Sequence, residues 1–244
     1  MSAIPNPHSE FFREPNLLVP GGKPVGMVKI DWMHSLADRI QFCSLFAPQR
    51  TDLVTDDVLL RNLNGTFPAN YYQQTAVNNT YISGGKVILF EDEMTWVGRL
   101  VPEYATASTP GKTIMLLETA TDEVCMFWYN AASDDYKALM KIAGSDKTVE
   151  LTVNDSFENQ DITLALRYNG SVLSMWKDGV EVAQNLGLSG NILNPTQVLS
   201  HGANRTGTNP YAGKLFHSYL WNRALSDREM VDVYKDPYQF LIPA

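Results

Sequence analysis

Hydrophobic and polar residues alternate along short stretches from about residue 29 onward, and turn-forming residues separate the stretches. Neighbouring side chains of a strand point to opposite sides, so this alternation predicts strands with one buried face. Three segments follow this alternation. TWVGRLV places Trp96, Gly98 and Leu100 on one face, and YKALMKIA does the same with Tyr136, Ala138, Met140 and Ile142. ITLALRY places Ile162, Leu164, Leu166 and Tyr168 on one face. TIMLLE and EVCMFWY are nearly continuous apolar runs, which is typical of strands covered on both faces.

The segment LALRYNGSVLSMWKDGVEVAQ contains the clearest turn signals of the chain. Asn169-Gly170 and Asp178-Gly179 each lie between two alternating runs. Both dipeptides tolerate the positive φ that tight two-residue turns require. The segment therefore predicts three antiparallel strands in a meander.

A late strand, GKLFHSYLWN, has apolar residues on both of its faces. Simple alternation puts Leu215, His217, Tyr219 and Trp221 on one face, and Phe216 and Leu220 on the other. This fits a central strand in a stacked pair of sheets. The chain has 244 residues, 44% of them hydrophobic, which is enough for one large core. We therefore expect an all-β, two-sheet antiparallel sandwich.

The hydrophobic period changes to that of a helix near the end of the chain. Ser226 is a good N-cap, and Glu229 can complete a capping box with it, while Leu225 and Met230 can form a hydrophobic staple. The helix should present Met230, Val233 and Tyr234 on one face and end at Asp236-Pro237. A helix this short needs tertiary contacts, so we expect it to cover an edge or end of the sandwich.

The first 28 residues differ in composition from the rest of the chain. They contain several glycines and Pro5, Pro7, Pro15, Pro20 and Pro24. Proline removes amide donors and restricts φ, so residues 1–28 are expected to form an extended arm before a β-sandwich domain of residues 29–244. The arm could lie on its own domain or on a neighbouring subunit. Trp32 follows the arm and is a candidate to plug the end of the sandwich.

Charge and apolar content exclude several kinds of partner. The net charge is −8, and the lysines and arginines are scattered, so we expect no nucleic-acid partner. No apolar run approaches the roughly 20 residues of a membrane span, and the first residues lack the pattern of a secretory signal. We therefore expect synthesis in a cytosol and no membrane partner. Cys43 and Cys125 lie inside apolar runs, which favours buried free thiols over a disulfide.

The closing segment YAGKLFHSYLWNRALSDREMVDVYKDPY resembles the terminal strand and helix of concanavalin-A-like jelly rolls of the laminin-G-like type. ITLALRYNGSVLSMWKDGVEVAQ resembles the central hairpins of that family, and DLVTDDVLLRNLNGTFP resembles, more loosely, its early Asp/Asn-rich loop. The resemblance covers residues 42–236. It implies a fold and not a function, because this fold hosts lectins, glycosidases and adhesion modules.

The segments GKPVGMVKIDWMHSLADRI and DPYQFLIPA, which flank this region, resemble laminin-G-like proteins of tailed bacteriophages. The resemblance implies a structural or accessory protein of the virion, either a capsid decoration or a tail appendage, assembled in the host cytoplasm. Residues 1–28 would dock on other virion proteins, the chain would form homo-oligomers in the particle, and the sandwich could adhere to cell-surface glycans. A stand-alone carbohydrate-binding module and a glycoside hydrolase are the alternatives.

No catalytic constellation is evident in the sequence, so we expect no enzyme. A glycosidase needs two carboxylates across a sugar, but the Glu-x-Asp-x-x-Glu motif of β-sandwich glucanases is missing. Glu91, Asp92 and Glu93 are consecutive and read as a solvated strand start. The four histidines accompany no nucleophile or zinc motif. His217 alternates with apolar residues and is expected to be a packed histidine.

Calcium is the common cofactor of the resembling family, and it takes oxygen ligands from loops. Oxygen-bearing side chains occur in two groups: Asp52, Asp56, Asp57, Asn62 and Asn64; and Asp134 and Asp135. Neither group matches a fixed ligand spacing. We therefore expect no metal ligands and no cofactor, with calcium as the alternative.

Sugar sites combine an aromatic ring with amide and carboxylate partners. Trp96, Trp128, Trp176 and Trp221 lie in strand patterns and are expected in the core. Two loops are therefore the better candidates for carbohydrate binding, and they contribute Asp134, Asp135, Tyr136, Asn204 and Arg205. Ordinary solvated turns are the competing interpretation of these loops.

Overall fold

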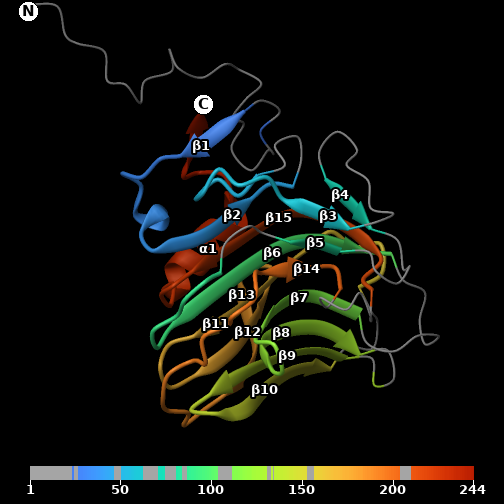
Figure 1. The fold of residues 1–244 in the computed structure, drawn as a ribbon, viewed down its shortest axis with the longest axis vertical. Helices are drawn as coiled ribbons and strands as arrows, with labels where there is room; N and C mark the ends of the chain where they lie inside the picture. The colour runs from blue at the N-terminus through green and yellow to red at the C-terminus, as the bar shows by residue number, and fades with distance from the viewer. Residues whose placement is uncertain are drawn as a thin grey trace, which may run out of the picture.

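A computed structural model describes residues 24, 27–46, 51–62, 71–74, 81–83, 87–103, 112–130, 133, 135–152, 157–203 and 210–244. Two seven-stranded sheets lie face to face, and the described chain also forms one short α-helix, a one-turn 3₁₀ helix (Ser35–Ala37) and a two-stranded sheet (Figure 1). Every ladder between the named strands is antiparallel. The predicted all-β antiparallel sandwich is confirmed.

One sheet carries the helix on its outer face, and we call it the helix-side sheet. Its strands, in spatial order, are β13 (Val180–Asn185), β12 (Leu173–Lys177), β11 (Ile162–Tyr168), β6 (Met94–Pro102), β15 (Gly213–Trp221) and β2 (Ile40–Ser44), and β4 (Tyr72–Gln74) also pairs with β15.

The second sheet faces it, and we call it the opposite sheet. Its strands, in spatial order, are β10 (Ser145–Thr152), β9 (Asp135–Ile142), β8 (Glu123–Asn130), β7 (Lys112–Glu118), β14 (Ser200–His201), β5 (Tyr81–Ser83) and β3 (Leu60–Asn62).

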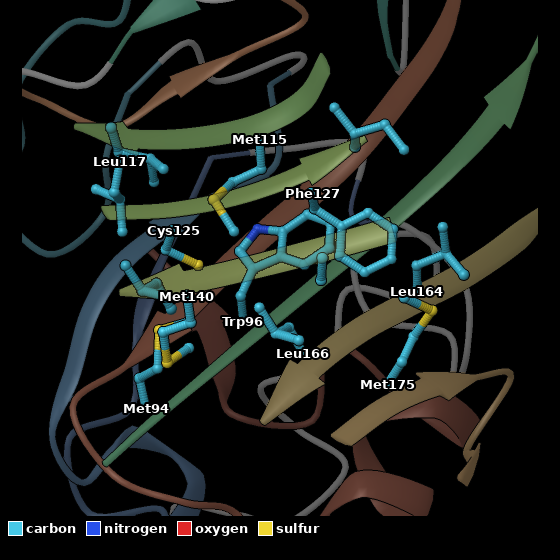
Figure 2. Packing of buried hydrophobic residues seen from close by; sticks show 14 of the residues in the cluster. Met94, Trp96, Met115, Leu117, Cys125, Phe127, Met140, Leu164, Leu166 and Met175 are labelled. Carbon is cyan, nitrogen blue, oxygen red and sulfur yellow. The ribbon is translucent and has the colours of Figure 1, made fainter. Parts of the chain in front are cut away.

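The main hydrophobic core lies between the two sheets, where the predicted inward faces of β6, β9 and β11 meet. Figure 2 shows Trp96 of the helix-side sheet beside Phe127 of the opposite sheet, and their ring centroids are 5.3 Å apart. Strand β7 is buried from Lys112 to Leu117, as predicted for a strand covered on both faces. The same prediction is wrong for β8, because Met126 and Trp128 on its outward face are only half-buried.

The predicted meander is formed by β11, β12 and β13. Asp178 and Gly179 have φ values of 51° and 77°, as a tight turn between Lys177 and Val180 requires. The earlier turn is displaced by one residue from the prediction. There, the Asn169 amide donates to the Val172 carbonyl across Gly170 and Ser171, and the Asn169 side chain accepts from the amides of the next turn residues.

A β-bulge changes the faces predicted for β15. The register with β6 shifts between Leu215 and His217, so Phe216 is an extra residue. Leu215 therefore packs in the inter-sheet core, whereas Tyr219 and Trp221 pack on the outer side. The prediction that all of these residues share one face is wrong, because a bulge reverses the alternation on one side of itself.

Helix α1 (Asp227–Lys235) begins with the predicted capping box between Ser226 and Glu229. Met230 and Val233 are buried in a second apolar cluster, together with residues on the outer faces of β6, β11, β12 and β15. The helix thus covers a sheet face, not an edge or end as predicted (Figure 1). Tyr234 is 42% exposed and does not join the buried face, because its ring lies over the turn at Gly179.

Replacing the helix cap should weaken the second apolar cluster. The Ser226 hydroxyl accepts from the Glu229 amide, and the Glu229 carboxylate accepts from the Ser226 amide at 2.8 Å. We expect Ser226→Ala to lower the free energy of unfolding by about 1 kcal/mol, and Ser226→Asp to retain most of it. Chemical denaturation followed by circular dichroism measures both variants. Equal losses in the two variants would contradict a capping role.

The two ends of the described chain lie together. Strands β1 (Val28–Ile30) and β16 (Leu241–Pro243) pair, and the Ala244 amide donates to the Met27 carbonyl. Trp32 is 59% exposed, so the expectation that it plugs the sandwich is wrong. Residues 1–23 lie outside the described residues, and the placement of the arm stays a prediction.

Cys43 and Cys125 are buried free thiols, as predicted. Burial raises the pKa of the Cys125 thiol to about 12. Among the described residues, no helix is long and apolar enough to cross a membrane.

Candidate functional site

A polar hollow of about 470 Å³ lies where the outer face of the helix-side sheet meets the end of α1. It is bordered by β6, the start of β11, the turn between β12 and β13, and the residues around the end of the helix. Its lining residues are Arg99, Asp161, Thr163, Asp178, Tyr234, Lys235 and Pro237. Both signs of charge and one aromatic ring are thus collected in one cavity.

Two carboxylates of the hollow are held by neighbouring donors. Arg99 donates from Nε and Nη2 to the two oxygens of Asp161 at 2.9 and 2.7 Å, and this bidentate hydrogen bonding raises the pKa of Arg99. Asp178 accepts from the Thr163 amide at 2.9 Å and from Lys177 Nζ at 2.6 Å. Both acidic side chains therefore have defined orientations while they remain partly exposed to solvent.

The rim of the hollow is formed by the last turn of α1. Tyr234 and Lys235 are exposed, and Pro237 is buried behind them. Gly179 leaves room for the tyrosine, because a Cβ there would lie 3.0 Å from Tyr234 Cδ1. The tight turn of the meander and the end of the helix thus support each other at this rim.

Beside the hollow, a row of cations and rings continues across the outer face of the helix-side sheet. The Arg99 guanidinium lies 5.4 Å from the centre of the Phe216 ring, and that ring lies 5.7 Å from the ring of Tyr71. Lys214 Nζ lies 5.4 Å from the centre of the Tyr71 ring. We call these four residues the aromatic row. The bulge of β15 places Phe216 on this outer side, next to Arg99 of β6.

Neither Asp135 nor Tyr136, the two described members of the predicted carbohydrate-binding set, lines the hollow. Asp134, Asn204 and Arg205 lie outside the described residues. Asp135 begins β9 and is 6% exposed, and Tyr136 is fully buried. The Tyr136 ring stacks on Phe157 at 5.4 Å, so it offers no open face to a sugar. Carbohydrate binding by these two loops stays a prediction, and Tyr136→Ala would test it poorly because this ring belongs to the core.

Two of the acidic residues considered for catalysis or calcium binding accept hydrogen bonds from backbone amides. Glu93 precedes β6, and its carboxylate accepts from the Ala224 amide at 3.1 Å. Asp52 is buried and accepts from the amides of Cys43 and Val54. In the part of the chain that the structure describes, no three His, Cys, Asp or Glu side chains are grouped closely enough to hold a metal ion.

The histidines of the late strands are packed among aromatic rings. His217 stacks on Tyr219 at 4.5 Å, as expected for a packed histidine. His201 stacks on Phe42 at 5.6 Å, and its Nε2 lies 2.8 Å from Ser218 Oγ. Burial lowers the pKa of His201 to about 3, so the ring is neutral at ordinary pH. Neither histidine is placed as a solvent-accessible base.

The hollow was not predicted from the sequence, because its residues come from separate parts of the chain. Arg99 lies in an alternating strand and Asp161 directly precedes another one, and charged residues at such positions are usually solvent-facing. Tyr234 was assigned to the buried face of the helix. The single local signal was Asp178-Gly179, which marks the turn but not the cavity that it borders.

Two solved structures with a similar fold are a neurotoxin binding domain and the binding domain of a mosquitocidal protein. The botulinum neurotoxin serotype G binding domain has 10% sequence identity and a TM-score of 0.66, over 79% of this chain and 50% of that chain. The binding domain of Paraclostridial Mosquitocidal Protein 1 has 14% identity and a TM-score of 0.65, over 82% of this chain and 52% of that chain. At these identities the likeness concerns the fold alone.

This chain spans about half the length of the toxin domains that it resembles. A scan of protein-family models and a search of curated proteins find no match to it. The comparisons therefore support a β-sandwich of the kind used in receptor-binding domains.

Proposed function

We propose that this chain is a structural or accessory protein of a bacteriophage virion, which docks through its N-terminal arm and displays the sandwich as a non-catalytic binding module for surface glycans. The binding role is supported by the similarity of its fold to receptor-binding domains. The virion role is supported by the two terminal segments that resemble tailed-phage proteins. The observation that carries the virion role is that these two terminal segments pair with each other in the structure.

That paired structure is the small sheet of β1 and β16. Val28–Ile30 belongs to GKPVGMVKIDWMHSLADRI, and Leu241–Pro243 belongs to DPYQFLIPA. The two segments that carry the phage resemblance therefore form one unit, at the point where the arm joins the sandwich. The Asp31 amide extends this pairing by donating to the Phe240 carbonyl. The unit is tied to the body, because Trp221 Nε1 of β15 donates to the Leu36 carbonyl. An arm attached here has a rigid base.

Deletion of residues 1–23, which make up most of the predicted arm, tests the docking role. We expect a chain lacking residues 1–23 to keep its fold, because β1 and the contacts of Val28 are retained. The same deletion should abolish incorporation into phage particles. Incorporation is measured by immunoblot of purified particles, and folding by thermal denaturation of the purified protein.

Two further chains make this result specific. Trp32→Ala removes an exposed ring outside the arm and should leave incorporation unchanged. Deletion of residues 1–30 also removes β1 and should lower thermal stability, which separates loss of docking from loss of folding. Normal incorporation of the chain without residues 1–23 would refute docking through the arm.

A carbohydrate-binding module that acts without a particle is the second candidate, and the hollow with its exposed Tyr234 favours it. The two candidates differ in one measurable property. A virion protein is retained on purified particles through a density gradient, whereas a free module is recovered in the soluble fraction of the lysate.

A further inference from the structure

We infer that the polar hollow and the adjoining aromatic row bind successive pyranose units of an oligosaccharide. This inference rests on the glycan-binding part of the proposed function and assigns it a place in the fold. The site differs from the two loops predicted from the sequence, and all of its residues lie in the described part of the chain.

The hollow presents the hydrogen-bonding groups that sugar hydroxyls require. A hydroxyl both donates and accepts, so it is best held between a carboxylate and a cation. Asp161 and Asp178 have side chains that are 45% and 29% exposed and can accept further bonds, since each oxygen has more than one lone pair. Lys235 is exposed at the rim and has no ion-pair partner among the described residues.

The carboxylates are also preorganised, which favours binding of a small polar ligand. Arg99 fixes Asp161 through two hydrogen bonds, and the Thr163 amide fixes Asp178. A ligand therefore immobilises few additional side chains when it enters. The cavity, of about 470 Å³, lies within the range of small-molecule sites.

Aromatic rings stand on both sides of this polar centre. Tyr234 is exposed at the rim, and Phe216 and Tyr71 are half-buried in the aromatic row beyond Arg99. The apolar C–H face of a pyranose ring packs against such rings. One sugar unit can occupy the hollow against Tyr234, and the next can lie along Phe216 and Tyr71.

The charge balance favours a sugar over a phosphate-bearing ligand. The hollow contains two cations, Arg99 and Lys235, and two anions, Asp161 and Asp178. A phosphate would meet the carboxylates as like charges, whereas hydroxyls can bond to groups of either sign. The bulge of β15 is an independent observation, because bulges often redirect a side chain beside a functional site.

A glycan array tests the inference with the purified full-length protein. The array carries defined neutral and uronic-acid oligosaccharides, and the strongest response is then titrated by calorimetry. We expect saturable binding, weakened roughly tenfold by Tyr234→Ala and by Phe216→Ala through loss of one stacked ring each. Lys235→Ala should weaken binding several-fold, and its exposed position leaves folding intact.

Matched variants separate a binding role from a structural one. Tyr234→Phe keeps the ring and should retain most of the affinity. Trp32→Ala removes another exposed ring outside the site and should leave binding unchanged. A folded protein that binds no arrayed oligosaccharide would overturn the inference. So would binding that Tyr234→Ala, Phe216→Ala and Lys235→Ala leave intact and Arg205→Ala abolishes.

Failure of this site can be told from failure of the virion role. Particles carrying Tyr234→Ala should incorporate the chain normally and lose only adsorption to glycan-coated beads. Normal adsorption by these particles would contradict the assigned site even if incorporation depends on the arm.

Discussion

Lowering the pH from 6.5 to 4.5 should reduce the free energy of unfolding by about 2 kcal/mol through His201. This residue is fully buried between Phe42 and Phe46, and burial lowers its pKa to about 3. In the unfolded chain the pKa returns to an ordinary value near 6.5. Below that pH the histidine binds a proton in the unfolded state but stays neutral in the folded state, so the free energy of unfolding falls.

The direction of this effect follows from the lowered pKa. The contribution of neutral His201 is fully present above pH 6.5 and is lost progressively as the pH falls toward 3. Glu229, whose pKa is also lowered, to about 2, contributes stability that is lost only below about pH 4.5. The interval from pH 6.5 to 4.5 therefore lies above the range in which the Glu229 contribution is lost.

Urea denaturation at several pH values measures the effect, and His201→Gln provides the control. The variant should be less stable at pH 7, because it loses the ring contacts and changes the bond to Ser218. Its stability should nevertheless fall much less between pH 6.5 and 4.5. Parallel pH profiles for the two proteins would show that His201 does not cause the acid sensitivity.

Gly98→Ala should destabilise the sandwich by about 3 kcal/mol, even though it adds a single methyl group. A Cβ at this position would lie 2.5 Å from Cζ2 and 2.9 Å from Cη2 of Trp96. The indole cannot move freely, since its Nε1 donates to Ser218 Oγ at 2.9 Å and its ring packs on Phe127. The substitution must therefore displace a buried ring or the strand itself.

A double-mutant cycle identifies the cause of this loss. If the clash is with the indole, Gly98→Ala should be much less harmful in a Trp96→Phe background, because the smaller ring vacates the space. Thermal and urea denaturation of the four proteins gives the coupling free energy. Additive effects of the two substitutions would show that Gly98 is required for another reason.

Local patterns predicted the elements of this fold well. Alternation located the inward faces of β9 and β11, and Asp178-Gly179 located a turn with two positive φ values. Ser226 and Glu229 marked the start of α1. These predictions succeeded because each depends on neighbouring residues, whose side-chain directions and turn preferences are set within one element.

Features that depend on a partner element were predicted poorly. The faces of β15 were wrong on one side of Phe216, because the bulge arises in the pairing with β6. Tyr234 was expected to be buried, but the position of α1 over the sheet leaves it at the rim of the hollow. The helical period shows which side of a helix is apolar, but it does not show how wide a surface packs against that side.

The sequence by itself determined that this protein is a β-sandwich with a meander and a capped terminal helix, because strand period, turn chemistry and helix capping are local properties. Only the tertiary structure decided that Arg99, Asp161, Asp178 and Tyr234 line one cavity. These residues are distant along the chain, and their proximity results from strand pairing, a bulge and the docking of α1, none of which a local pattern specifies.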